Sequence, residues 1–387
     1  HFGSSFQLPL LQGAMGGLSQ RDVVVACTAA AAGAAAVQLW TSRRRGKQVA
    51  SSPRCDESSG AAALRSPYSR VACVGTGVIG ASWAALYAAK GMTVAMYSRN
   101  ASKLQADAAR ARRHIDEMES LGLLPRGTAA AAKARLREAS SLEDAVADVE
   151  LVQETIAEDE AVKREFYIAV GRAAPPDAVI ASSTSGLMIS KVIEGLDKRL
   201  AARVMVAHPF NPPHIIKLVE LVPMPGMSAE TISTVDRFFR ACDRSPVLLK
   251  REVPGHIGNR LQAAVWREAI SLVARGVASV ADVDTALHEG PGMRWALMGM
   301  HSIFDLGGGA GRYRGFFDGI GRAAFEPIWE DMDSWNAPPL EAKELCIAGV
   351  EEQLAARGYS REELAAWRNS TLAELVKMKQ LLELKSR

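Results

Sequence analysis

Two residues near the middle of the chain, His208 and Glu220, are suited to moving a proton. His208 directly follows a mostly apolar run, 203–207, that predicts a strand, and prolines stiffen the loop that it opens. Glu220 lies among the apolar residues of 217–223, which predict the next strand. A carboxylate behind an imidazole fixes the tautomer and raises the basicity of the ring. A single histidine after a strand is more often structural, so the prediction of a catalytic base depends on Glu220.

A glycine-rich turn that begins at residue 75 is suited to holding phosphate groups. It follows the apolar run 71–74 and leads into an alanine-rich helix, 81–90, and a second strand, 93–97. In such a unit the first glycine permits the tight turn, the second lets the backbone approach a pyrophosphate, and the third allows close helix–strand packing. The helix N-terminus offers free N–H groups to the phosphates. The unit predicts a dinucleotide site, and the alternative is a tight turn in an unliganded sheet. The turn residues predicted to bind the cofactor are Gly75, Gly77, Val78, Ile79 and Gly80.

The end of the second strand bears on the choice of dinucleotide. A site for NAD normally has an acidic residue there, which holds the ribose 2′-hydroxyl. This chain has Ser98-Arg99-Asn100 instead. A carboxylate would repel a 2′-phosphate, whereas Ser98 and Arg99 can bind and neutralise one. The pair therefore favours NADP, and the alternative is a surface arginine beside a site for NAD.

The surrounding pattern predicts the elements that position these residues. Helices are expected at 100–124 and 130–137, with further core strands at 149–153 and 178–182. This alternation predicts an α/β fold, a Rossmann-type doubly wound sheet over residues 67–252. From Pro254 onward the pattern is helical, which predicts an all-helical C-terminal domain over 253–387. The helices expected in that domain are 262–275, 281–288, 340–358 and 361–385.

The stretch from Arg70 to about Gly299 resembles the 3-hydroxyacyl-CoA dehydrogenase superfamily. Beyond the glycine-rich turn, the motifs that carry the resemblance are Glu154–Lys163, Ser182–Leu187, His208-Pro-Phe-Asn-Pro, Leu218-Val-Glu-Leu-Val and Pro254–Leu261. Within the superfamily the chain is most similar to the lambda-crystallin branch, the L-gulonate 3-dehydrogenases, through Ser182–Met188, Ala207–Pro213 and Glu289–Arg294. The segment Gly290–Gly299 is also similar to bacterial carnitine 3-dehydrogenases.

The resemblance implies roles for individual residues. It implies that His208 is the catalytic base and Glu220 its orienting partner, and that Ser185 and Asn259 hydrogen-bond the substrate oxygen. It also implies that Glu158 and Lys163 contact the nicotinamide-side ribose and its surroundings; on spacing alone these two would be an exposed helix face. A homodimer formed through the helical domain is implied as well.

Two departures from the family pattern bear on cofactor and substrate. Ser98 replaces the family's ribose-binding aspartate, so the family implies NAD while the residues suggest NADP. The Pro-Met-Gly-Pro element of CoA-dependent members is replaced by Ala296-Leu-Met-Gly-Met300. Arg294 could bind a free carboxylate with its guanidinium fork, and a structural salt bridge is the alternative.

These features together predict an NAD(P)-dependent dehydrogenase that oxidises the 3-hydroxyl of a small hydroxy acid, with L-gulonate as a candidate substrate. One alternative is a 3-hydroxyacyl-CoA dehydrogenase of fatty-acid metabolism. An alternative of another class is a nucleotide-binding structural protein similar to a crystallin. The presence of all four predicted catalytic residues argues against this last alternative.

Composition and charge exclude other classes and set the N-terminal segment apart. The chain has 387 residues, 48% of them hydrophobic, and a net charge of +3. Residues 1–66 hold seven Lys/Arg against three Asp/Glu, so the remainder is nearly neutral and does not suit a nucleic-acid partner. Within this leader, the uncharged run Val23–Trp40 precedes basic residues, which predicts either a membrane anchor or an organelle-targeting segment. The catalytic part is expected to be cytoplasmic.

The cysteines and histidines give no sign of a metal centre in the sequence. The five cysteines lie far apart and form no CxxC pair, which fits a reducing compartment. His114, His256 and His301 are expected to be core or surface residues. No group of residues has metal-ligand spacing, so the sequence predicts no metal.

Overall fold

The computed structural model describes residues 65–358 and 360–386. The predicted leader, with its uncharged run Val23–Trp40, lies outside the described residues. Among the helices that are described, none is both long enough and apolar enough to span a bilayer.

Eight strands form one sheet, in the order β3-β2-β1-β4-β5-β6-β7-β8. They are β1 (Arg70–Val74), β2 (Thr93–Tyr97), β3 (Leu136–Glu138), β4 (Leu151–Glu154), β5 (Val179–Ser182), β6 (Val204–Pro209), β7 (Leu218–Pro223) and β8 (Ser245–Leu248). Neighbours pair in parallel except β6 and β7, which are antiparallel. The strand order reverses between β1 and β4, where a doubly wound sheet leaves a crevice at its carboxyl edge. The predicted Rossmann-type sheet is confirmed.

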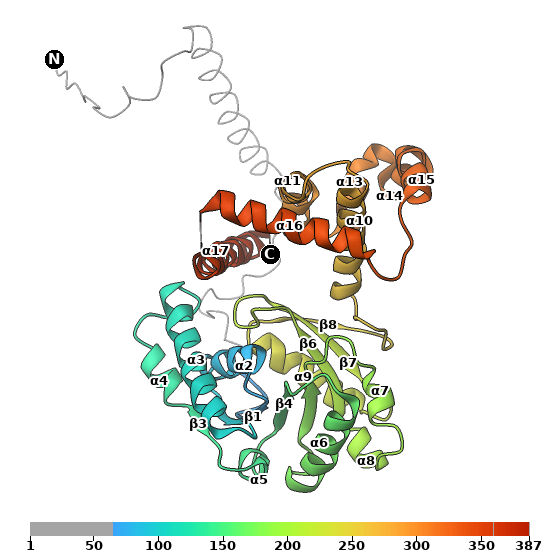
Figure 1. Ribbon diagram of the computed structural model, residues 1–387. Coiled ribbons are helices and arrows are strands. Elements are labelled where there is room, and N and C mark those ends of the chain that lie inside the picture. Colours follow the sequence, from blue (N-terminus) through green and yellow to red (C-terminus); the bar gives the residue numbers. More distant parts are fainter. Residues whose placement is uncertain (1–64, 359, 387) are drawn as a thin grey trace, which may run out of the picture. The chain divides into compact units, whose positions relative to one another are not determined.

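Helices cover both faces of the sheet (Figure 1). One face carries α2 (Val78–Ala89), α3 (Ala101–Ser120), α4 (Ala129–Lys133) and α9 (Ala229–Ala241). The other carries α5 (Leu142–Val146), α6 (Glu160–Ala173), α7 (Ile189–Val192) and α8 (Lys198–Ala201). Large aromatic side chains fill the first layer, where the rings of Trp83 and Tyr87 stack with their centroids 5.3 Å apart. The two cores hold the carboxyl ends of the central strands in fixed positions.

Both edges of the sheet differ from expectation. The helix predicted over 130–137 is wrong in its second half, because α4 ends at Lys133 and residues 136–138 form β3, paired with β2. The alanine run favours a helix, but pairing with β2 buries the Leu136 side chain in the core on the α2 and α3 face of the sheet. Strand β8, at the opposite edge, was not predicted. It contains Pro246, and an edge strand is where a sheet tolerates proline.

From α10 onward the chain is helical, which confirms the predicted C-terminal domain. The helices are α10 (Gly258–Ala274), α11 (Val280–Glu289), α12 (Pro291–Leu297), α13 (Met300–Gly307), α14 (Arg312–Phe316), α15 (Arg322–Asp331), α16 (Leu340–Arg357) and α17 (Arg361–Ser386), with short helical turns at Gly309–Gly311 and Phe317–Gly321. The predicted helix 262–275 is the greater part of α10, which begins four residues earlier, at Gly258.

Candidate active site

The three glycines of the turn after β1 have different surroundings. Gly75 has a φ of +83°, and a Cβ atom there would collide with the Thr155 carbonyl. A Cβ atom on Gly80 would collide with the Gly75 carbonyl. A Cβ atom on Gly77 would meet nothing closer than Lys103 Nζ, at 3.9 Å. Gly75 and Gly80 therefore keep the turn compact, while Gly77 leaves its backbone open to an approaching group.

The N-terminus of α2 is open, unlike those of three other helices that cover the sheet. Side chains of Asn100, Ser141 and Asp159 cap α3, α5 and α6, each accepting a backbone N–H of the first turn. Helix α2 begins after Gly77 and has no side-chain cap. Its first N–H groups and the positive end of its dipole are thus available to an anion. This arrangement fits the pyrophosphate of a dinucleotide.

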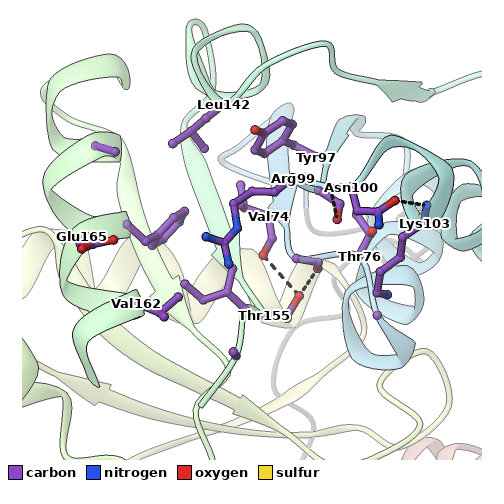
Figure 2. Close-up of a pocket in the computed structure, with 17 residues that line it drawn as sticks. Val74, Thr76, Tyr97, Arg99, Asn100, Lys103, Leu142, Thr155, Val162 and Glu165 are labelled. Carbon is purple, nitrogen blue, oxygen red and sulfur yellow. Dashed lines mark hydrogen bonds between the residues drawn. The ribbon is translucent and has the colours of Figure 1, made fainter. Parts of the chain in front are cut away.

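A cavity of about 600 Å³ lies at the carboxyl ends of β1, β2 and β4 (Figure 2). It is lined by Val74–Gly77, Tyr97–Asn100, Lys103, Leu142, Thr155–Ala157, Val162, Glu165, Phe166 and Ala169. The side chain of Arg99 points into it, and the ammonium group of Lys103 is held by Asp107 at 2.6 Å. The residues predicted to select the dinucleotide, Ser98 and Arg99, therefore both line the cavity.

The antiparallel pairing of β6 and β7 places His208 directly opposite Glu220. Side chains opposite each other in such a pair project from the same face of the sheet. His208 Nδ1 lies 2.9 Å from Glu220 Oε2, and both residues are buried. An ionised carboxylate only accepts hydrogen bonds, so Nδ1 carries the proton and Nε2 is left as an acceptor. Nε2 lies 3.0 Å from Ser185 Oγ, whose hydroxyl can donate to it.

The second oxygen of Glu220 joins the sheet to the helical domain. Oε1 accepts the backbone N–H groups of Ile257 and Gly258, at 2.7 and 2.9 Å, and so caps α10. Burial acts to raise the pKa of Glu220, but the hydrogen bonds from His208 and from these two N–H groups outweigh it and lower the pKa. The carboxylate stays ionised, as an orienting partner of His208 requires. Asn259 is the next residue of α10, so this cap also positions Asn259.

Glu158 connects the loop of Ser185 to the end of β4. Its Oε1 accepts the Ser185 N–H at 2.7 Å and the Thr184 hydroxyl at 2.9 Å. Burial acts to raise the pKa of Glu158, but the Ser185 N–H and the Lys163 ammonium outweigh it and lower the pKa. Since Ala157 lines the cavity and Glu158 holds Ser185, the two predicted sites are neighbours along the chain and in space.

Lys163 lies beneath this loop and is only 1% exposed. Its Nζ is 2.7 Å from Glu154 Oε1 and 3.2 Å from Glu158 Oε2. Glu154 is fully buried and also accepts hydrogen bonds from Ser182 and Tyr167. Lys163 thus contacts both carboxylates, and Glu158 is the more exposed of the two residues predicted to lie near the ribose. The cofactor contact of Lys163 stays a prediction.

A second hollow, of about 580 Å³, adjoins the predicted catalytic residues. The lining residues that could contact a substrate are Ser185, Asn259, Arg260, Trp266, Arg267, Trp335 and Asn336. Its complete lining contains two arginines and no acidic residue. A periodic spacing on α10 (Asn259, Ala263, Trp266 and Ile270) was the available signal for this face, and sequence reasoning missed it.

Arg294 is not brought together with the other predicted residues. It lies exposed on α12 and is absent from the lining of the hollow, where Arg260 and Arg267 are found instead. The sequence assigned Arg294 to the substrate carboxylate from its motif alone. The helical pattern does not predict which helices of the C-terminal domain face the sheet. Its contact with substrate stays a prediction.

Comparisons with known proteins identify both parts of the chain. Residues 70–253 match the 3-hydroxyacyl-CoA dehydrogenase NAD-binding domain, and residues 255–344 match the 3-hydroxyacyl-CoA dehydrogenase C-terminal domain. An L-carnitine dehydrogenase of Streptomyces griseus is 40% identical over 316 residues, covering 80% of this chain and 89% of that enzyme. A 3-hydroxyacyl-CoA dehydrogenase of Gibberella moniliformis is 40% identical over 241 residues, covering 62% of this chain and 73% of that enzyme.

A solved structure of a dehydrogenase is also similar to this chain over most of its length. An NAD⁺-dependent dismutase, 5-formyl-3-hydroxy-2-methylpyridine 4-carboxylic acid 5-dehydrogenase, is 25% identical with a TM-score of 0.66. The match covers 81% of this chain and 98% of that one.

Proposed function

Because the chain belongs to the 3-hydroxyacyl-CoA dehydrogenase family, and is thus an NAD-dependent dehydrogenase, we propose that it oxidises the 3-hydroxyl of a small hydroxy acid. The observation that carries the reaction is the chain of contacts from Glu220 through His208 to Ser185. The observation that favours a free acid is the hollow beside it, with two arginines and no acidic residue in its lining.

The residues divide the work as follows. His208 Nε2 accepts the proton of the substrate 3-hydroxyl, and Glu220 stabilises the imidazolium that forms. Ser185 and Asn259 hydrogen-bond the substrate oxygen as it becomes a carbonyl. A bound nicotinamide dinucleotide would supply the hydride acceptor for C3. The open N-terminus of α2 would hold its pyrophosphate, and Glu158 would contact the nicotinamide-side ribose.

Carnitine is the substrate that we place first, ahead of L-gulonate. Trp266 and Trp335 line the hollow together with the two arginines, and an indole ring attracts a quaternary ammonium group through its π face. An arginine would bind the carboxylate of the same molecule. The likeness to enzymes named L-carnitine dehydrogenases supports this order. L-gulonate, which has no cationic group, stays a second candidate.

A substrate panel tests the proposal. We expect the purified protein to oxidise a free 3-hydroxy acid, carnitine before L-gulonate and 3-hydroxybutyrate, with a higher kcat/KM than 3-hydroxybutyryl-CoA. A preference of tenfold or more for the CoA ester would instead support the 3-hydroxyacyl-CoA dehydrogenase alternative. If none of the four were turned over while NADH still bound, the nucleotide-binding structural alternative would gain support.

Two arginine variants test which residue binds the carboxylate, and a third, Arg294→Gln, is their matched control. A hydrogen bond to a charged group contributes about 1.5–3 kcal/mol, roughly ten- to a hundredfold in affinity. We expect Arg260→Gln or Arg267→Gln to raise KM for the best acid by that factor, and Arg294→Gln to leave it nearly unchanged. An increase confined to Arg294→Gln would restore the role predicted from the sequence.

We also propose that the dinucleotide cavity accepts NADP at least as well as NAD. Ser98 and Arg99 line it, and no acidic residue follows β2 to repel a 2′-phosphate. We expect Ser98→Asp to shift the ratio of the two dissociation constants toward NADH by about tenfold or more, since it restores the carboxylate. Titration of both reduced cofactors, followed by nicotinamide fluorescence, measures this ratio.

Ser102→Asp is the control for cofactor choice. It adds the same charge on α3 at an exposed position that does not line the cavity, so the ratio should change much less. A parent protein that favours NADH tenfold would contradict the proposal, because Arg99 would then not reach the ribose.

Three further expectations stay predictions. The homodimer implied by the resemblance accords with the exposed apolar side chains of the helical domain, among them Trp329 and Trp367. The cytoplasmic location expected for the catalytic part and the targeting or anchoring role of the leader also stay predictions.

A further inference from the structure

Three ionisable side chains meet away from the catalytic residues, on the face of the sheet covered by α2 and α3. His114 and Glu117 lie one turn apart on α3, and His214 lies in the loop between β6 and β7, 97 residues after Glu117. His114 Nδ1 and His214 Nε2 each lie 3.2 Å from the same oxygen, Glu117 Oε2. One donor atom from each of the three residues falls within 4.8 Å of the others. The sequence predicted no metal, and the fold brings together a set of ligands that linear spacing could not reveal.

We propose that His114, Glu117 and His214 bind a divalent transition-metal ion of the zinc class. Two imidazoles and a carboxylate are ligands that Zn²⁺ prefers, and a water molecule would complete a tetrahedron. With bonds of about 2.0–2.1 Å, tetrahedral geometry separates the ligand atoms by about 3.3 Å. The two distances of 3.2 Å match that separation, whereas they lie at the long end for hydrogen bonds.

Neighbouring groups hold two of the three ligands, His214 and Glu117, in the orientation that an ion needs. Ser82 Oγ lies 2.6 Å from His214 Nδ1 and can accept a hydrogen bond from a proton on that nitrogen, which leaves Nε2 for the metal. Asn369 Nδ2 donates to Glu117 Oε1 at 2.8 Å, which leaves Oε2 for the metal. Such outer hydrogen bonds are a regular feature of protein metal sites, because they fix the tautomer and the ring plane. Ser82 and His214 are each 1% exposed, so the support is rigid.

The charges around Glu117 agree with this assignment. Among the described residues, the basic side chains within ion-pair distance of Glu117 are the two imidazoles alone. No lysine or arginine of the described part of the chain forms an ion pair with this partly buried carboxylate, so no fixed positive charge lies beside it. A divalent ion would supply that charge and use the lone pair of each ring.

The position of the cluster indicates a structural role. His214 belongs to the loop between β6 and β7, and Asn369 belongs to α17. An ion would therefore link α3 to the loop between β6 and β7, and α17 would be attached through the hydrogen bond from Asn369 to Glu117. The ion would not touch the His208–Glu220 pair. We expect metal binding to raise the melting temperature and to leave the chemical step unchanged.

Cobalt substitution of the full-length protein tests the proposal. Co²⁺ added to the EDTA-treated, dialysed protein should give the intense visible absorption of a tetrahedral nitrogen–oxygen site, at one ion per chain, and Zn²⁺ should displace it. Glu117→Gln and His214→Gln should each weaken Co²⁺ binding by on the order of a hundredfold or more. Ser82→Ala should weaken it by about 10–100-fold, the usual effect of losing an outer hydrogen bond.

Controls separate this site from other metal-binding groups and from unfolding. His288 and Glu289 form an exposed histidine–carboxylate pair at 3.0 Å, and His288→Gln should leave Co²⁺ binding unchanged. NADH binding shows that each variant is folded, and it does not depend on the metal or on the substrate. The proposal is overturned if folded parent protein gives no tetrahedral spectrum, or if the spectrum persists in folded Glu117→Gln and His214→Gln. In either case the three side chains form a hydrogen-bonded cluster only.

Discussion

Replacing His208 by glutamine is expected to lower kcat by about 10²–10⁴, the usual contribution of a positioned general base. Glutamine can still reach Glu220 and Ser185, but its amide cannot take the proton of the substrate hydroxyl. The dinucleotide cavity does not include His208, so the dissociation constant for NADH should stay within about twofold. Steady-state kinetics with the best substrate of the panel, together with NADH titration, measure both quantities.

His301→Gln is the matched control for this variant. His301 is exposed and bonds Tyr313 at 2.8 Å in the helical domain, away from the β6–β7 pair. It should turn over at the parent rate. The fall of kcat/KM toward low pH, which reports protonation of an essential base, should disappear in His208→Gln alone. Turnover of His208→Gln at the parent rate would show that another group removes the proton.

The parts of the site that the sequence predicted are those fixed by local pattern or by consecutive strands. The glycine-rich turn has its strand, turn and helix within one short segment, so residue type and spacing determine its conformation. Glu220 could be assigned to His208 because β6 and β7 follow each other directly. An antiparallel neighbour then brings the two side chains to one face, and the register places them opposite each other.

The parts that the sequence could not predict depend on contacts between distant segments. Neither the burial of Lys163 between two carboxylates nor the meeting of His114 with His214 is visible in spacing, because both follow from how helices pack on the sheet. The arginines of α10 were missed for a related reason. A helical pattern identifies an amphipathic face, but it does not say which side chains line a hollow.

Replacing Lys163 by methionine is expected to lower the free energy of unfolding by about 3–5 kcal/mol. The substitution leaves the Glu154 carboxylate fully buried without the Lys163 ammonium, which lies 2.7 Å away in the parent protein, so a negative charge there would be uncompensated. The hydrogen bonds from Ser182 and Tyr167 reduce this penalty without removing it. Urea unfolding, followed by circular dichroism, measures the change.

Two further variants decide whether burial of the pair is the cause. Lys133 and Asp116 form an ion pair of nearly the same length, 2.6 Å, but their side chains are 33% and 55% exposed. Lys133→Met should therefore change the free energy of unfolding by no more than about 1 kcal/mol. Adding Glu154→Gln to Lys163→Met removes the unpaired charge and should recover part of the lost stability.

If Lys163→Met and Lys133→Met proved equally mild, the Lys163–Glu154 pair would contribute no more than a surface ion pair. Lys163 would then be needed only to hold Glu158 against the Ser185 loop, and its loss should appear in kcat and not in stability.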